Sequence, residues 1–149
     1  MELIIKSFDE LTPLEVYGIL KLRCAAFIVE QKCRYVDEDD KDIGAVHVFG
    51  REGDGRIVAC LRILDKHQRF DEISIGRVVV DAAFRHKGIA REMMRTALAH
   101  IRATAGQEPV RISAQAHLEA FYGSLGFARC SDTYLEEGIP HVEMLAENA

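Results

Sequence analysis

The 149-residue chain contains no apolar run long enough to span a membrane, and its first residues, MELIIKSFDE, lack the basic start and apolar stretch of a secretory leader. Its four cysteines are too scattered for the paired spacing of a zinc site and too few for a disulfide scaffold. The sequence therefore predicts a cytoplasmic protein with reduced thiols, no metal and no membrane partner.

A basic excess is also absent, since 19 Lys and Arg stand against 24 Asp and Glu, for a net charge of −5. A nucleic-acid partner normally requires a basic face, so this balance argues against one and is compatible with a small cationic substrate. No repeat, linker or low-complexity tract divides the chain. The length therefore predicts one domain, 1–149, with one substantial core.

Periodicity and turn signals predict alternating strands and helices. Thr12, Pro13 and Glu15 form a helix start, and apolar residues recur at helical spacing to about Glu30, in one helix or two. The expected strands are 1–8, 45–52, 56–64, 73–81, 109–114, 127–134 and 139–146, and the further helices are 89–105 and 118–125. This order predicts an α+β fold with one mixed β-sheet flanked by helices, in which strands 73–81 and 109–114 are parallel.

The stretch FRHKGIAR, residues 84–91, stands where the strand 73–81 gives way to the helix 89–105. A helix N-terminus carries unpaired N–H groups and a partial positive charge, and Gly88 allows the backbone to approach a ligand closely. Arg85 and Lys87 add positive charge, so the stretch is either a pyrophosphate cradle or only a tight turn. It matches neither the Walker pattern nor the G-x-G-x-x-G pattern.

Other motifs give this stretch a wider context. Residues 78–90, VVVDAAFRHKGIA, resemble motif A of the GNAT superfamily, the acetyl-coenzyme A-dependent N-acetyltransferases, with its [RQ]-x-x-G-x-[GA] signature after a valine-rich strand. Residues 120–127, AFYGSLGF, are similar to the second GNAT signature, a helix with F-Y followed by G-F. The runs LRCAAFIVEQ, QAHL and GIPH, which begin at Leu22, Gln115 and Gly138, resemble the ElaA-like branch.

The resemblance implies the GNAT fold and a site for acetyl-coenzyme A as co-substrate. Backbone N–H groups of 86–90 would hold the pyrophosphate, and Arg85 would order that loop or contact the phosphate. The valine strand would bind pantetheine in a gap where it splays from 109–114, and an N–H near Val78 or Val79 would polarise the thioester carbonyl. The implied cofactor residues are Val78, Val79, Val80, Arg85, His86, Lys87, Gly88, Ile89, Ala90 and Gln115, the last where many GNATs have Asn.

The resemblance also implies a proton donor. Tyr122 occupies the family position of the general acid that protonates the departing coenzyme A thiolate. The alternative is that Tyr122 only packs against Phe121 and Phe127.

Three side chains are candidates for the general base that takes a proton from the attacking amine. Glu30 ends a predicted helix near the expected acceptor side, and His117 and His141 carry an imidazole, the side chain most often used as a general base. Glu143 would share a strand face with His141. Each also has a plain structural interpretation, as a solvated helix end or a satisfied hydrogen-bonding residue.

Two further features keep alternatives open. The acidic run 37–42 is either an electronegative lip that attracts a polyamine or basic peptide, or a solvated loop, the simpler expectation. Arg77, among valines, would bind a substrate carboxylate or pair with a carboxylate of this loop. A covalent route through Cys24 or Cys33 lacks an activating partner, so direct transfer is expected.

The leading hypothesis is an N-acetyltransferase that transfers acetyl to a primary amine of a small molecule or peptide in a ternary complex. The alternative is a non-catalytic acetyl-coenzyme A-binding sensor or complex subunit. The last hairpin, 127–146, has an edge through which a homodimer would form.

Overall fold

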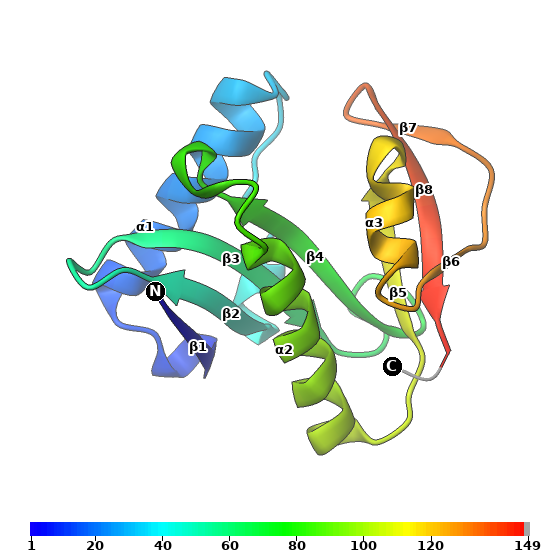
Figure 1. Ribbon diagram of the computed structural model, residues 1–149, viewed down its shortest axis with the longest axis horizontal. Coiled ribbons are helices and arrows are strands. Elements are labelled where there is room, and N and C mark those ends of the chain that lie inside the picture. Colours follow the sequence, from blue (N-terminus) through cyan, green and yellow to red (C-terminus); the bar gives the residue numbers. More distant parts are fainter. Residues whose placement is uncertain (148–149) are drawn as a thin grey trace.

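The computed structural model describes residues 1–147. Eight strands form one sheet in the order β1-β2-β3-β4-β5-β8-β6, with β7 paired to the beginning of β8 (Figure 1). The strands are β1 Glu2–Ser7, β2 Val46–Arg51, β3 Ile57–Leu64, β4 Ile73–Val80, β5 Val110–Gln115, β6 Ala128–Arg129, β7 Tyr134–Glu136 and β8 Ile139–Ala146. The α-helices are α1 Pro13–Arg23, α2 Ile89–Ala105 and α3 Glu119–Gly123. The predicted α+β fold with a mixed sheet is confirmed.

The first helix begins as its sequence predicts. The Glu15 N–H donates to Thr12 Oγ1 at 3.1 Å, and the Thr12 N–H donates to Glu15 Oε1 at 2.9 Å, which makes a reciprocal capping box. After Arg23 the chain continues as the π-helical segment Cys24–Glu30. None of the helices within residues 1–147 combines the length and the apolar character that crossing a bilayer requires.

The alternation of side chains along the strands divides the core between the two faces of the sheet. Leu61 and Ile63 of β3 belong to the cluster that α2 covers, whereas Cys60 belongs to the cluster that α1 covers. The buried residues of α2 recur at helical spacing: Ile89, Met93, Met94, Ala97 and Ile101. The two long helices therefore hold the sheet from opposite sides.

The strands β4 and β5 are parallel, as predicted, but they pair only at their beginnings. The paired residues are Ile73 with Val110 and Ser74 with Arg111. Farther along, β5 keeps β8 as its partner through Gln115, while β4 keeps β3 (Figure 1). The predicted splay between these two strands is confirmed.

A β-bulge interrupts β4 beside this splay. Cys60 of β3 pairs with Val79, but Arg62 pairs with Gly76, so β4 has one extra residue between the two pairs. Arg77 lies in the bulge with φ of +53°. A bulge redirects the side chains next to it, and a left-handed backbone costs a non-glycine residue about 1–2 kcal/mol.

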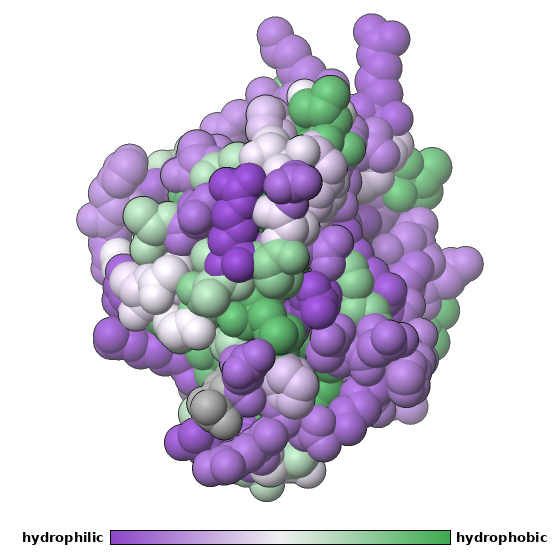
Figure 2. Space-filling view, turned by 90° about the vertical axis from the view of Figure 1, so that its right-hand side faces the viewer, coloured by the Kyte–Doolittle hydropathy of each residue, from purple (hydrophilic) through white to green (hydrophobic). Residues whose placement is uncertain are grey.

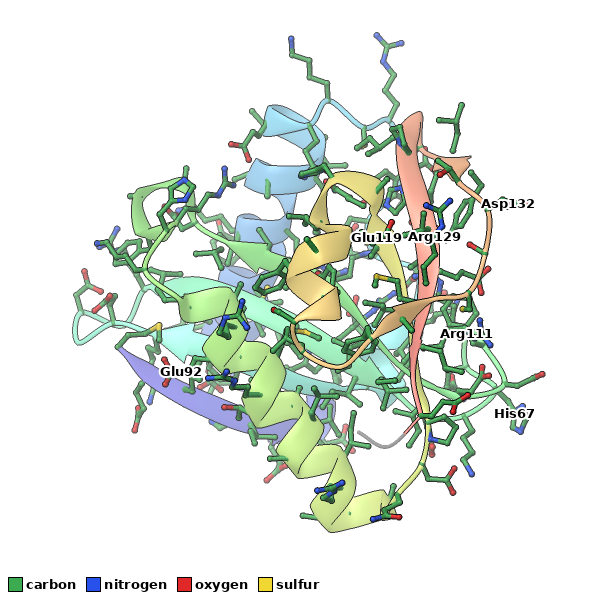
Figure 3. The ribbon with its side chains drawn as sticks, turned by 45° about the vertical axis from the view of Figure 1, so that its right-hand side comes forward. His67, Glu92, Arg111, Glu119, Arg129 and Asp132 are labelled. Atoms are coloured by element: carbon green, nitrogen blue, oxygen red, sulfur yellow. The ribbon has the colours of Figure 1, made fainter. Side chains whose placement is uncertain are left out.

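The prediction of one strand over 127–134 is wrong, because β6 and β7 are separate strands that both pair with β8. In the connection, Ser131 makes a hydrogen bond to β8 and another to a nearby residue. Its hydroxyl accepts from the Glu143 N–H at 2.8 Å and its carbonyl accepts from Arg129 Nε at 2.8 Å. Arg129 of β6 also lies beside Glu119 of α3, at 3.3 Å, while Asp132 lies farther out on the connection (Figure 3).

The face over β6 and β8 is mostly hydrophilic, with a smaller apolar area near its centre (Figure 2). The homodimer expected through the hairpin edge on this side stays a prediction.

Candidate active site

A cleft of about 830 Å³ lies where β4 and β5 separate. One side is formed by the end of the π-helical segment, the segment 33–41 and β4, and the other by β5, α3 and the β7–β8 turn. Most of the predicted site residues line it: Glu30, Val78, Val79, Val80, Arg85, His86, Ala90, Gln115, His117, Tyr122 and His141. Lys87, Gly88 and Ile89 complete the adjoining loop and helix start without lining the cleft.

The start of α2 has the properties of an anion site. Gly88 is its N-cap with φ of +78°, and the first bond within the helix runs from the Glu92 N–H to the Gly88 carbonyl at 3.1 Å. The N–H groups of Ile89, Ala90 and Arg91 come before that bond, so they have no hydrogen-bond acceptor within the helix. A Cβ added at Gly88 would meet no protein atom within 4 Å, so the space above the loop is open. These features fit a pyrophosphate.

Arg85 holds this loop in place. Its Nη1 and Nη2 donate to the two carboxylate oxygens of Glu30 at 2.8 and 2.7 Å, and its Nε donates to the Val80 carbonyl at 3.0 Å. Of the two predicted roles, ordering the loop is the one that these contacts support. The hydrogen bonds from Arg85 lower the pKa of Glu30, and a lowered pKa makes a carboxylate a weaker base. The pair therefore argues against Glu30 as the general base.

Tyr122 of α3 both packs and faces the cleft. Its ring makes edge contacts with Phe121 and Phe127, at centroid distances of 5.0 and 6.2 Å. It also lines the cleft, so the two predicted roles do not exclude each other. Burial raises the pKa of Tyr122 to about 12, which keeps the hydroxyl protonated at neutral pH.

His141 of β8 presents a basic nitrogen to the same cleft. Its Nδ1 lies 2.7 Å from the Ile139 carbonyl, which can only accept a hydrogen bond, so Nδ1 carries the proton. In the neutral ring Nε2 then has the free lone pair. Nε2 lies 3.5 Å from the Glu136 carboxylate, which would stabilise a protonated ring. Glu136 also accepts from Arg69 at 2.7 Å and from Ser113 at 3.3 Å.

The other candidate bases lie in different settings. His117 lines the cleft from an exposed position on the 3-10 turn Ala116–Leu118. Glu143 pairs with Arg111 at 3.0 Å in a separate hollow next to the β3–β4 loop (Arg111 in Figure 3). Gln115, level with His141 in the sheet, reaches across the cleft and donates to Gln31 at 3.3 Å. His141 therefore has the geometry that best suits a base.

The expectation of a solvated acidic loop over 37–42 holds only for Glu38 and Asp40, which are exposed, and is wrong for Asp37 and Asp42, which are buried. Arg23 donates to Asp37 at 2.6 Å and to Asp42 at 2.7 and 3.1 Å, and Arg62 donates to Asp39 at 2.7 Å through each of two nitrogens. We call the six ion-paired residues the arginine–aspartate network: Arg23, Arg62, Arg77, Asp37, Asp39 and Asp42. Asp39, Arg62 and Arg77 of the network line the β4 side of the cleft, where the carboxylate of Asp39 is paired with Arg62.

Residues 23–147 match the family described as an acetyltransferase (GNAT) domain. The chain belongs to the GNAT acetyltransferase family. It is 39% identical to protein ElaA of Escherichia coli (strain K12) over 141 residues, 93% of this chain and 92% of ElaA. A UPF0039 protein of Schizosaccharomyces pombe is 39% identical over 148 residues, 99% of this chain and 97% of that protein.

Two solved structures share this fold closely. The crystal structure of E. coli ElaA superposes with a TM-score of 0.92 at 36% identity, covering 99% of this chain and 100% of that chain. A Pseudomonas aeruginosa protein described as an acyl-CoA N-acyltransferase superposes with a TM-score of 0.91 at 38% identity, covering 97% of each chain.

Proposed function

We propose that this GNAT chain is an acetyl-coenzyme A-dependent N-acetyltransferase that acts on a primary amine by direct attack in a ternary complex. One observation carries the proposal. The cleft between β4 and β5 holds a buried tyrosine that stays protonated, Tyr122, and an imidazole whose free nitrogen is the basic one, His141. An acid and a base in one cleft are what acyl transfer from a thioester to an amine requires.

Acetyl-coenzyme A supplies the acetyl group as an activated thioester. The open helix start would bind its pyrophosphate, and the unpaired edge of β4 would bind its pantetheine arm, because β5 leaves that edge after Ser74. An N–H beside the bulge would polarise the thioester carbonyl. The residues assigned to this half of the cleft are Val78, Val79, Val80, Arg85, His86, Lys87, Gly88, Ile89, Ala90 and Gln115.

His141 and Tyr122 handle the two protons of the reaction. His141 Nε2 takes the proton that the ammonium must lose before its nitrogen can bond to the acetyl carbon. Glu136, beside that nitrogen, stabilises the charged ring. Tyr122 gives its proton to the sulfur as the carbon–sulfur bond breaks. Burial raises the pKa of Cys33, which also lines the cleft, so its thiol is a poor nucleophile and direct transfer is favoured.

The test is acetyl-coenzyme A-dependent thiol release across classes of amine: small amines, polyamines, amino acids and peptides with free lysine or N-terminus. Release that requires both the amine and acetyl-coenzyme A supports the proposal, and the acetylated product identifies the acceptor. Stabilisation of the fold by acetyl-coenzyme A with no thiol release in any class would refute catalysis and favour a binding-only protein.

Replacing His141 by Gln should lower kcat/KM by about 10² at neutral pH, because general base catalysis contributes about 10²–10⁴ and solvent can deprotonate part of the amine. The loss should shrink as pH rises, since more of the amine is then already neutral. The measurement is kcat/KM against pH for both proteins. His100→Gln is the matched control, because His100 lies on α2 outside the cleft lining. An unchanged kcat/KM in His141→Gln would remove the base role.

A further inference from the structure

The two sides of the acceptor half of the cleft carry opposite net charge. Among the charged side chains that line the β4 side, the three cations Lys41, Arg62 and Arg77 stand against one carboxylate, Asp39. On the β7–β8 side, Arg69 balances Glu136, and Glu137 adds one negative charge. An acceptor with charges of both signs would therefore match the cleft better than one with a single sign.

Arg77 faces the cleft with part of its guanidinium unused. Its Nε lies 2.8 Å from Asp37 Oδ1, and its Nη2 donates to the Asp37 carbonyl at 3.2 Å and lies 3.6 Å from Asp39. Within residues 1–147, Nη1 donates no hydrogen bond, and the side chain keeps 18% of its surface exposed where it lines the cleft. Two N–H donors are thus left for a ligand.

The position of Arg77 is itself unusual. It occupies the bulge with φ of +53°, directly before Val78. The Arg77 Cζ atom lies 5.4 Å from the centroid of the Tyr35 ring, so a cation–π contact holds the guanidinium in addition to its bonds with Asp37. A charged side chain kept in a strained backbone position beside the reaction centre indicates a functional demand there.

Lys41 supplies a second free cation. It lies in the 3-10 turn Lys41–Gly44, where its backbone N–H donates to Asp39 Oδ1 at 3.1 Å. That bond holds the backbone, while the ammonium group has no partner among the described residues and the side chain lines the cleft. Lys41 and Arg77 both line the cleft close to Asp39, which accepts from the Lys41 backbone N–H and lies 3.6 Å from Arg77 Nη2.

We propose that the acceptor is a primary amine that also carries a carboxylate, such as an amino acid. Arg77 Nη1 and Lys41 would bind the carboxylate. The ammonium would be drawn to Glu136 and Glu137 and lose its proton to His141. This inference rests on the proposed function and narrows its substrate class. A polyamine is disfavoured, because its second ammonium would meet Lys41.

The experiment is thiol release from acetyl-coenzyme A with glycine, β-alanine, γ-aminobutyrate and ε-aminohexanoate, each beside its uncharged carboxamide at equal free-amine concentration. Charge-assisted hydrogen bonds predict that at least one acid is preferred over its amide by about tenfold or more in kcat/KM. The member with the largest preference would measure the spacing between the carboxylate site and the reacting centre.

The variant Lys41→Met should reduce that preference by about tenfold, and the matched variant Lys21→Met, on the exposed side of α1, should keep it. Thermal stabilisation by acetyl-coenzyme A, measured in the unmodified protein and both variants, shows whether the fold and the part of the cleft that binds acetyl-coenzyme A are intact. Equal rates with acids and amides, or a preference for polyamines, would overturn this inference and leave the proposed function standing. Absence of release with every amine would overturn both.

Discussion

Replacing Tyr122 by Phe should lower kcat by about 10³ while leaving the affinity for acetyl-coenzyme A unchanged. General acid catalysis contributes about 10²–10⁴, and Phe removes only the hydroxyl that would protonate the leaving sulfur. The ring stays, so its edge contacts with Phe121 and Phe127 are kept. Steady-state thiol release gives kcat, and ligand-induced thermal stabilisation gives the binding.

Tyr17→Phe is the control for this experiment, since Tyr17 is 67% exposed on α1 and does not line the cleft. It should behave as the unmodified protein does in both measurements. A Tyr122→Phe protein with undiminished kcat would remove the acid role and leave Tyr122 as a packing residue. A loss of acetyl-coenzyme A binding equal to the loss of kcat would show that the hydroxyl serves binding instead.

The parts of the fold that could be predicted from sequence are those set by nearby residues. Thr12 and Glu15 are three positions apart and cap α1 between themselves, so the signal is local. The parallel arrangement of β4 and β5 follows from a strand–helix–strand order that has few packing solutions. The two GNAT-like motifs, taken in their order along the chain, predicted that Tyr122 and the N-terminus of α2 lie beside the gap between β4 and β5.

The parts that sequence could not reveal depend on distant partners. An acidic run looks the same whether it is solvated or buried, and Asp42 is buried because Arg23 and Arg62, 19 and 20 positions away, meet it. The bulge at Arg77 depends on the register between β3 and β4, which local propensity does not encode. Glu136 was not predicted as a site residue, because it read as part of a turn rather than as the neighbour of His141.

Replacing Arg23 by Met should destabilise the protein by about 3–5 kcal/mol, because removing one partner of a buried ion pair leaves the other charge without compensation. The Arg23 side chain is 1% exposed and bonds to both Asp37 and Asp42. Without it, Asp42 would keep only its ion pair with Arg62, and Asp37 only its ion pair with Arg77. Urea unfolding at neutral pH gives the free energy. Arg56→Met removes an exposed ion pair with Asp54 and a contact with the Phe84 ring, and it should destabilise the protein far less than Arg23→Met does.

The difference in unfolding free energy between Arg23→Met and the unmodified protein should decrease as pH falls. Burial raises the pKa of Asp42, but hydrogen bonds and charge from Arg23 and then Arg62 outweigh it, so the net pKa is lowered. A carboxyl with a lowered folded-state pKa stabilises the protein above its unfolded pKa of about 3.9 and loses that contribution as pH falls through the folded value. Without Arg23, burial has the larger effect on the pKa of Asp42 and raises it. Protonation of Asp42 at low pH then removes an uncompensated buried charge in the variant, whereas in the unmodified protein it breaks a favourable ion pair. Unfolding free energies measured between neutral pH and about pH 3 should therefore converge, and a gap that stays constant would show that the cost of Arg23→Met comes from packing rather than charge.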